Sequence, residues 1–405
     1  MRVFFVMAFI LQMLPWSPPR QQPAVTFARN TAKLTFPDSA VFSTTINSSE
    51  TVTDVELLYG TDVRTCSEVQ ALAIPEFEPA RTVNVAWEWD MLESGALPPG
   101  TKIWWQWRVT VESGALMLSE RRTITWLDAV HNWKEIEDRG IRLHYYTLSA
   151  DRAREFLVTA INAMERLKAD TGMEASGTID LYLYANTKDM RDALLYEPTW
   201  AGAMAFPDHN KVVVGISENL EWTKRTEAHE LTHVLTGNYT FTCLQMTPTW
   251  LEEGLAVYGE GNPDAETQES FETARKSNSL LSFRVLSAGF AEESEQASLS
   301  YSQSFYMVNY LIETYGREKI NRLLKVLSQG TVLDDALMEV YGFDLLGFEK
   351  EWRDSVGVPL ADWYEEALES TMMPTEVPTL RPLAGVLNAV SSDFPKQTRT
   401  PQPEG

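Results

Sequence analysis

The chain has 405 residues, of which 44% are hydrophobic and 22% charged, a composition that is normal for folded proteins and excludes a largely disordered chain. The length suggests two or three domains. Lysine and arginine total 34 against 57 aspartates and glutamates, so the formal net charge is −23. A field of this sign repels phosphate backbones, and we therefore expect no nucleic acid among the partners.

Cysteine and histidine are both scarce. Two cysteines, Cys66 and Cys243, exclude a disulfide-rich scaffold and a cysteine-rich metal or iron–sulfur site. Because they lie far apart in the sequence and are expected in different domains, we expect two free thiols rather than a bridge. Of the five histidines, His131, His144 and His209 are isolated, and we expect surface or hydrogen-bonded roles for them.

Residues 1–24 have the pattern of a secretory signal peptide. The basic start Met1-Arg2 precedes an apolar run from Val3 to Leu14, which is too short to span a bilayer as a helix. A buried strand or a short uncleaved anchor is the alternative. No later run approaches the length of a membrane span. We therefore expect no integral membrane segment in the mature chain and a secreted, extracellular or cell-surface location.

Residues 25–130 are predicted to form an all-β sandwich. In the segment 102–111 apolar and polar residues alternate with period two, which indicates a half-buried strand. A turn and a returning strand follow at 112–126, and earlier strands are expected at 32–36, 40–46, 52–59 and 80–89. The turn Leu-Pro-Pro-Gly-Thr at 97–101 resembles that of fibronectin type III domains, which implies an immunoglobulin/fibronectin-like sandwich.

Residues 131–371 mix strands and helices and are predicted to form a second domain. Strands are expected at 141–147, 179–184 and 211–214, and helices at 150–171 and 187–195. Beyond residue 221 almost everything is predicted to be helical, and Gly237 and Gly259 are among the expected helix ends. Residues 372–405 are rich in proline and threonine, and we expect them to be disordered.

Two histidines stand in the segment His229-Glu230-Leu231-Thr232-His233. On a helix, positions i and i+4 lie one turn apart on the same face, so both imidazoles can bind one ion. Glu230 lies about 100° round the helix, where its carboxylate can take a proton from a water on the metal. The pattern predicts a Zn²⁺ site with His229 and His233 as ligands. The alternative is a structural helix with two hydrogen-bonded histidines.

Zinc needs a third protein ligand, and we expect it on the next helix. That helix is predicted to follow Thr247-Pro248 and to end at Gly259. No histidine lies downstream of His233 and no aspartate lies close to it. The downstream ligand is therefore a glutamate, either Glu252 or Glu253.

The histidine motif followed by Trp-Leu-x-Glu-Gly-hydrophobic-Ala at 250–256 resembles the gluzincin metallopeptidases, in particular the peptidase MA-like group and, more distantly, the thermolysin-like zinc aminopeptidases. In these families the glutamate before the glycine binds zinc, which implies Glu253, whereas the usual aminopeptidase spacing selects Glu252. Because the loop 238–246 can absorb one extra residue and the helix cannot, we predict Glu253 as the third ligand. The resemblance spans about residues 135–360. It implies an α+β fold with a zincin-like catalytic domain, which combines a small mixed sheet with helices.

The resemblance also bears on the surroundings of the metal. Thermolysin-like enzymes often carry an acidic residue four positions after the ligand glutamate, where it orients a zinc histidine. Here that position is Val257, so either another group supplies this contact or His229 is held less firmly. Tyr301 could donate a hydrogen bond to the oxyanion, with Tyr258 and Tyr306 as rivals and a packing role as the alternative.

Two further features are candidates for substrate contact. Residues 202–206 could form the edge strand that pairs with an extended substrate in zincins, although an ordinary strand of small residues would look the same. Trp200 and Trp222 either line a substrate pocket or belong to the core.

The sequence thus predicts a secreted zinc metallopeptidase that hydrolyses peptide bonds by a metal-activated water, with Glu230 as general base and a peptide or protein as substrate. The alternative is a catalytically inactive zincin-like protein that serves in cell-surface binding or adhesion. Endopeptidase and aminopeptidase activity both stay open. The lack of a glycine-rich, acidic amine-anchoring motif upstream of the histidines favours an endopeptidase. The oligomeric state also stays open.

Overall fold

The structure is a computed structural model, and it describes residues 24–95, 97–195, 201–244, 247–290 and 294–360. The expected disordered tail, Trp200 and all but the last residue of the expected signal peptide lie outside the described residues. The chain divides into the units Met1–Val358 and Pro359–Gly405. All elements described below belong to the first unit.

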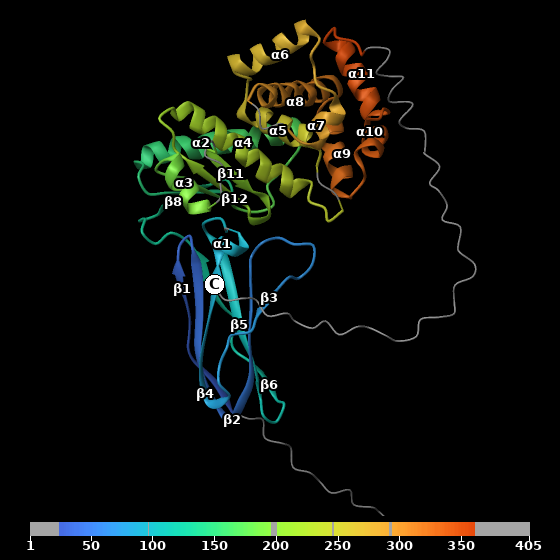
Figure 1. The fold of residues 1–405 in the computed structure, drawn as a ribbon. Coiled ribbons are helices and arrows are strands. Elements are labelled where there is room, and N and C mark those ends of the chain that lie inside the picture. Colours follow the sequence, from blue (N-terminus) through green and yellow to red (C-terminus); the bar gives the residue numbers. More distant parts are fainter. Residues whose placement is uncertain (1–23, 96, 196–200, 245–246, 291–293, 361–405) are drawn as a thin grey trace, which may run out of the picture. The chain divides into compact units, whose positions relative to one another are not determined.

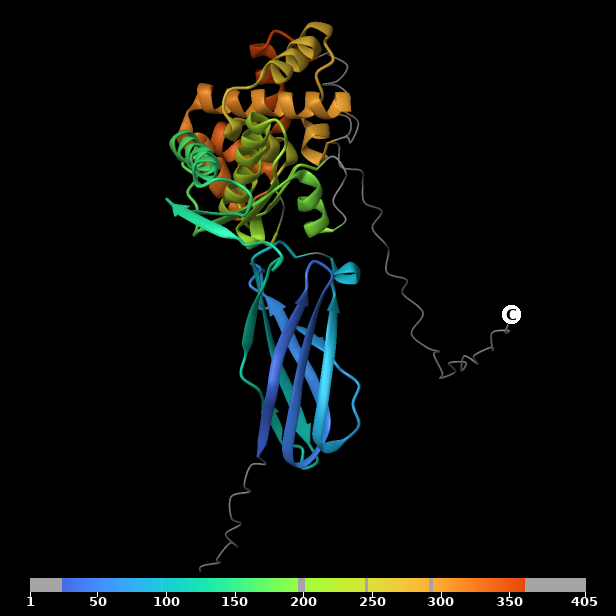
Figure 2. The same cartoon turned by 90° about the vertical axis from the view of Figure 1, so that its left-hand side faces the viewer.

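The described residues between 25 and 126 form seven strands and one short helix, and the strands run along a common direction (Figure 2). The helix is α1 (Met91–Ser94). The strands are β1 (Val25–Thr35), β2 (Ser39–Thr61), β3 (Ala71–Ala73), β4 (Ala80–Asp90), β5 (Thr101–Val111), β6 (Leu116–Leu118) and β7 (Arg122–Trp126).

The long strand β2 takes part in two sets of pairings. Its first half pairs with β1 and β4, and its second half pairs with β3 and β5, to which β6 and β7 are added. The register shifts between Asn47 and Val52, where the halves meet. Phe42 from the first half and Leu57 from the second share one core with Trp107 of β5. The seven strands form one hydrogen-bonded sheet whose two halves are joined by β2 and share this core, in agreement with the predicted all-β sandwich.

The second part of the chain contains a five-stranded mixed sheet in the order β11-β12-β10-β9-β8. The central strands β9, β10 and β12 are parallel, and the edge strands β8 and β11 are antiparallel to their neighbours. Residues 202–206 therefore contain an edge strand, as predicted. The strands are β8 (Lys134–Asp138), β9 (Ile141–Tyr145), β10 (Ile179–Tyr184), β11 (Ala203–Phe206) and β12 (Lys211–Gly215).

Helices cover both faces of this sheet (Figure 1). Alternate residues of a strand point to opposite faces. Leu181 and Leu183 of β10 accordingly share a core with α2 (Ala150–Thr171) and α4 (Leu220–Tyr239), whereas Tyr182 packs with α3 (Thr187–Leu194). Buried on both sides, the sheet is a rigid base for α4.

Apart from one short 3-10 helix before β12, the remaining helices follow α4 in the sequence, and α5 lies between α4 and α8 (Figure 1). Within the described residues, none of the helices combines the length and the apolar character that crossing a membrane requires. The helices are the 3-10 helix η1 (Pro207–His209) before β12, then α5 (Thr249–Glu260), α6 (Ala265–Ser277), α7 (Phe283–Ala288), α8 (Ser294–Tyr315), α9 (Arg317–Ser328), α10 (Leu333–Tyr341) and α11 (Leu345–Ser355).

Gly237 and Gly259 do not end their helices, and the prediction is wrong for both. α4 continues through Gly237 to Tyr239, and α5 continues through Gly259 to Glu260. A β-carbon at Gly259 would lie 2.0 Å from Oγ1 of Thr232 on α4, and one at Gly237 would collide with η1. Glycine is needed at both positions because neighbouring elements approach closely, not because the chain turns there.

Cys66 and Cys243 form a disulfide, so the expectation of two free thiols is wrong. Their α-carbons lie 5.8 Å apart although 177 positions separate them in the sequence. Arg64, two residues before Cys66, donates hydrogen bonds to the carbonyl oxygens of Gly237 (3.1 Å) and Asn238 (3.4 Å) near the end of α4. The loop after β2 thus contacts the C-terminal end of α4, a proximity that sequence distance does not reveal.

Candidate metal centre

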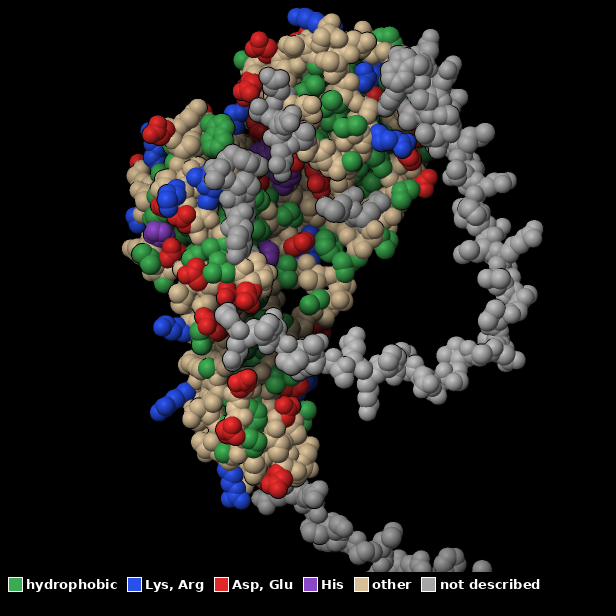
Figure 3. Space-filling view, viewed as in Figure 1, with side chains coloured by type: hydrophobic (Ala, Val, Ile, Leu, Met, Phe, Trp, Pro, Cys, Tyr) green, Lys and Arg blue, Asp and Glu red, His purple; other side chains and the backbone are tan. Residues whose placement is uncertain are grey.

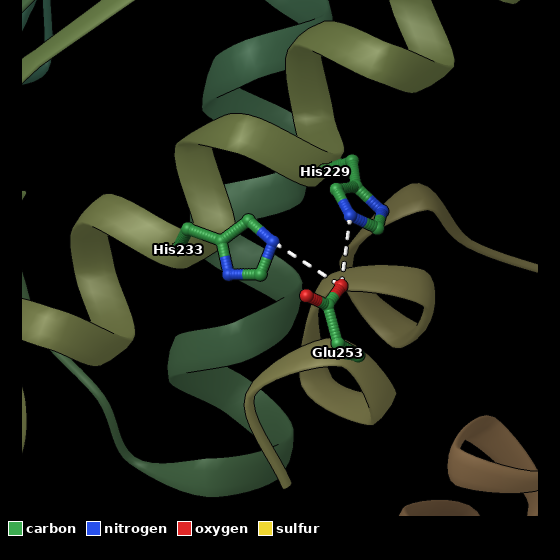
Figure 4. A group of neighbouring side chains, drawn as sticks. All are labelled: His229, His233 and Glu253. Atoms are coloured by element: carbon green, nitrogen blue, oxygen red, sulfur yellow. Dashed lines mark ion pairs between the residues drawn. The ribbon is translucent and has the colours of Figure 1, made fainter. Parts of the chain in front are cut away.

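The helix α4 presents both motif histidines on the side that faces α5 (Figure 4). The helix begins after Asn219, whose side chain accepts a hydrogen bond from the backbone N–H of Trp222. Leu231 and Val234 bury the opposite side in the core. The rings of His229 and His233 have centroids 4.9 Å apart, as the i, i+4 spacing predicts.

The helix α5 brings Glu253 to the two histidines. Gly254 follows it, and a β-carbon there would lie 2.4 Å from the backbone oxygen of Ser304 on α8. Since α5 packs this closely against α8 and, through Gly259, against α4, its position is set from both sides. The Glu-Gly pair of the sequence pattern is thereby explained: the glycine permits the close packing that holds the glutamate in place.

The three side chains converge on one point (Figure 4). Oε2 of Glu253 lies 3.4 Å from Nε2 of His229 and 3.4 Å from Nε2 of His233, and all three side chains are largely buried. Their potential ligand atoms lie within 4.8 Å of one another. Glu252 lies outside this group, and burial raises the pKa of its carboxyl. Of the two candidate glutamates, Glu253 is the one beside the histidines.

The ionisable side chains that converge here strongly shift one another's pKa values. Burial opposes the charged form of Glu253, but the two histidines outweigh it and lower the pKa of Glu253 to about 2. Burial likewise opposes a charged His229, but Glu253 and Glu260 raise its pKa to about 10, and Glu253 also raises the pKa of His233. The carboxylates create a negative electrostatic potential that favours the charged form of both imidazoles. The same potential favours a bound cation.

Glu260 is the acidic partner of His229 that position 257, a valine, does not provide. Its Oε1 lies 2.8 Å from Nδ1 of His229, and its Oε2 lies 2.6 Å from the guanidinium of Arg225. Arg225 also donates to the carbonyl oxygen of Asn262. With Nδ1 engaged by Glu260, the Nε2 of His229 is directed towards Glu253.

Sequence reasoning missed Glu260 because it ended the helix at Gly259. Glu260 lies seven positions after Glu253, two turns along α5, where both side chains share one face. That periodicity was available in the sequence. Arg225, one turn before His229 on α4, follows the same rule.

Tyr301 faces the same site. Its ring centroid lies 6.0 Å from that of His229, and burial, together with the nearby carboxylates, raises its pKa. The rival tyrosines are engaged elsewhere: Tyr258 donates to Asp170 (3.0 Å), and Tyr306 stacks on Phe271 with centroids 3.9 Å apart. Among these three, Tyr301 is the one placed to contact a bound substrate.

A cavity of about 350 Å³ opens beside the histidines, and its walls include Glu230, His229 and Tyr301. Ala203 at the start of β11 and Trp222 of α4 also line it. The space-filling view shows histidine side chains at the bottom of a hollow with acidic side chains next to them (Figure 3). The general base predicted from the sequence therefore borders a space that a ligand can enter.

The other three histidines lie away from this centre. His144 forms a 2.9 Å hydrogen bond with Asp180, and His131 stacks on Tyr146 with centroids 3.8 Å apart. His209 belongs to η1. The surroundings of His144 and His131 agree with the roles expected for them, whereas Nδ1 of His209 is buried without a hydrogen-bond partner among the described residues.

Three solved structures show partial likeness to the chain. A catalytically inactive OgpA of Akkermansia muciniphila in complex with an O-glycopeptide substrate is 14% identical, with a TM-score of 0.21 over 27% of this chain and 30% of that one. An aminopeptidase A of Legionella pneumophila is 13% identical, with a TM-score of 0.32 over 80% and 50%. A polysaccharide deacetylase of Bacillus cereus is 10% identical, with a TM-score of 0.19 over 52% and 66%.

In each case the alignment spans less than two thirds of the other protein, and likeness at this level does not extend to function. No curated protein sequence matches the chain significantly. The sequence profile of the Peptidase MA superfamily, in contrast, matches residues 159–358, which include α4, α5 and the three converging side chains. This part of the chain is therefore peptidase MA-like.

Proposed function

We propose that the protein is a secreted zinc-dependent peptidase in which His229, His233 and Glu253 bind Zn²⁺ and Glu230 is the general base. The observation that carries the proposal is the state of Glu253. Its Oε2 is buried and meets no hydrogen-bond partner among the described residues, although it lies between two imidazole nitrogens. A buried carboxylate oxygen that accepts no hydrogen bond is costly unless a ligand completes it.

The distances from Glu253 to the two histidines fit zinc. Zinc–nitrogen and zinc–oxygen bonds are about 2.0–2.2 Å long, and two ligands at a tetrahedral angle are then about 3.4 Å apart. This is the separation of Glu253 Oε2 from both Nε2 atoms. Two histidines and one glutamate leave a fourth position for water, which is the ligand set of catalytic rather than structural zinc.

The side chains around this set have separate tasks. A bound zinc ion would lower the pKa of a water and polarise the scissile carbonyl. Glu230 takes the proton that the water loses as it attacks the carbonyl carbon, and then delivers it to the nitrogen of the departing amine. Glu260 and Arg225 hold His229 in the orientation that its role requires.

Two further features position the substrate. The phenol of Tyr301 borders the cavity and, protonated at neutral pH, can donate a hydrogen bond to the oxyanion. The edge strand β11 pairs with β12 on one side, so its other side can pair with an extended peptide. A peptide or protein is therefore the proposed substrate.

Secretion is supported by two independent features. The N-terminal residues have the signal-peptide pattern. The chain also contains the Cys66–Cys243 disulfide, and disulfides persist mainly in oxidising compartments outside the cytosol. The proposed location is therefore extracellular or at the cell surface.

The decisive experiment compares metal content and peptidase activity in four proteins. The wild type should contain about one equivalent of zinc and cleave peptides. Glu230→Gln should keep the zinc and lose activity by several orders of magnitude. Glu253→Ala should lose the metal, whereas Glu252→Ala, a change at the adjacent residue, should retain it. Full activity of Glu230→Gln contradicts the mechanism, and loss of zinc from Glu252→Ala alone contradicts the ligand assignment.

The alternative, an inactive zincin-like binding protein, predicts wild type with less than about a tenth of an equivalent of zinc. It is not favoured, because His229, His233 and Glu253 lie together as a complete ligand set and Glu230 borders the adjacent cavity.

A further inference from the structure

The cavity beside the histidines continues along α4 to Trp222, two turns before His229. Trp222 is a large apolar side chain of this helix that remains 43% exposed. A single exposed apolar side chain is common on protein surfaces, and what distinguishes Trp222 is that it lines the same cavity as His229 and Glu230. Between Trp222 and His229 the wall is made by the short side chain of Thr226.

The opposite wall of the cavity leaves room for the indole of Trp222. A β-carbon at Gly202 would lie 2.3 Å from the ring of Trp222, so a larger residue there would displace the indole. Ala201 and Ala203 flank this glycine and also line the cavity. One edge of the indole is thus packed against the start of β11, and the exposed part of the side chain borders the cavity.

The charged side chains at the far end of the cavity form ion pairs and largely neutralise one another. Arg225 pairs with Glu260 at 2.6 Å and with Asp264 at 3.6 Å. With Glu230 also in the wall, the lining carries more carboxylates than cations. An acidic side chain entering this space would meet like charges, whereas a neutral side chain would not.

From these walls we infer that the cavity recognises an aromatic side chain next to the scissile bond, with Trp222 as the specificity-determining residue that stacks on it. The inference rests on the proposed peptidase function. A peptide paired with β11 places alternate side chains on either side of its backbone, and one side chain close to the reacting carbonyl can then enter the cavity. Offset or edge-to-face contact of an aromatic ring with the indole adds to the free energy of simple burial.

The test uses one peptide sequence with a single scissile bond and either Phe, Leu, Ala, Lys or Glu beside it. We expect kcat/KM to be highest for Phe, about tenfold or more above Ala, and lowest for Glu. Trp222→Ala should reduce the Phe-over-Ala ratio about five- to tenfold, and Trp222→Phe should retain most of the ratio. Trp104→Ala, the same change on β5 away from the cavity, should leave the ratio unaltered.

A preference for Ala, Lys or Glu, or an equal loss for all peptides in Trp222→Ala, overturns the inference while leaving the proposed function intact. Calorimetry of peptide binding to the Glu230→Gln variant distinguishes failure of the proposed function from failure of this inference. If the wild type cleaves none of the peptides but this variant binds them in the order Phe above Ala above Glu, the peptidase proposal fails and the side-chain preference stands. No binding preference in this variant overturns the inference as well.

Discussion

Removal of the Cys66–Cys243 disulfide should lower the free energy of unfolding substantially, because the bond closes a very long loop. The two cysteines are 177 positions apart, and the loss of chain entropy in the unfolded state for a loop of that length corresponds to about 5 kcal/mol at 25 °C. Engineered and native disulfides commonly deliver less than this limit, about 2–4 kcal/mol. We therefore expect Cys66→Ser/Cys243→Ser to lose about 2–5 kcal/mol.

The assay is guanidinium unfolding of metal-free protein, followed by circular dichroism and tryptophan fluorescence. Metal is removed because a ligand that binds only the folded state adds to its apparent stability. A reducing agent should destabilise the wild type to about the level of the double variant and should not affect the double variant. This pair of measurements separates the covalent bond from the packing of the two side chains.

The reasoning is refuted if the double variant loses less than about 1 kcal/mol and the reducing agent has no effect on the wild type. The two cysteines would then be independent thiols, and contacts such as those of Arg64 with the end of α4 would account for the attachment of the β2 loop.

Three further changes test other parts of the structure. Glu260→Gln should weaken zinc binding about 10–100-fold, measured by chelator competition, because it removes the charged partner of His229 Nδ1; unchanged affinity would show that Glu260 does not orient the ring. Gly254→Ala should destabilise the protein by about 1–3 kcal/mol in the same unfolding assay, since the new methyl group meets the backbone oxygen of Ser304; a neutral effect would contradict the close packing of α5 on α8. Burial, aided by a nearby lysine, lowers the pKa of His209 below its ordinary value of 6.5, so its contribution to stability is present above that value and is lost as the pH falls through the lower folded-state pKa. The melting temperature of the wild type should therefore fall more between pH 7.5 and pH 5 than that of His209→Gln, and parallel curves would rule this out.

Local patterns predicted the elements well. The period-two alternation at 102–111 corresponds to β5, and the spacing His-Glu-x-x-His lies on a helix with both rings on one side. Both follow from backbone geometry, which repeats every two residues in a strand and every 3.6 in a helix. The glycine rule failed at Gly237 and Gly259, because a glycine required by a close neighbour cannot be distinguished in the sequence from a glycine required by a turn.

The sequence by itself thus determined the class of the fold and the residue types available to hold a metal. It favoured Glu253 over Glu252 only through a local resemblance, it ended the helix of Glu253 one residue before Glu260, and it predicted that Cys66 and Cys243 are free thiols. Only the tertiary structure decided these points, since each depends on the angle and distance between elements remote in the sequence. Packing of side chains sets those quantities, and one residue of rotation on a helix, about 100°, directs a different carboxylate at the histidines.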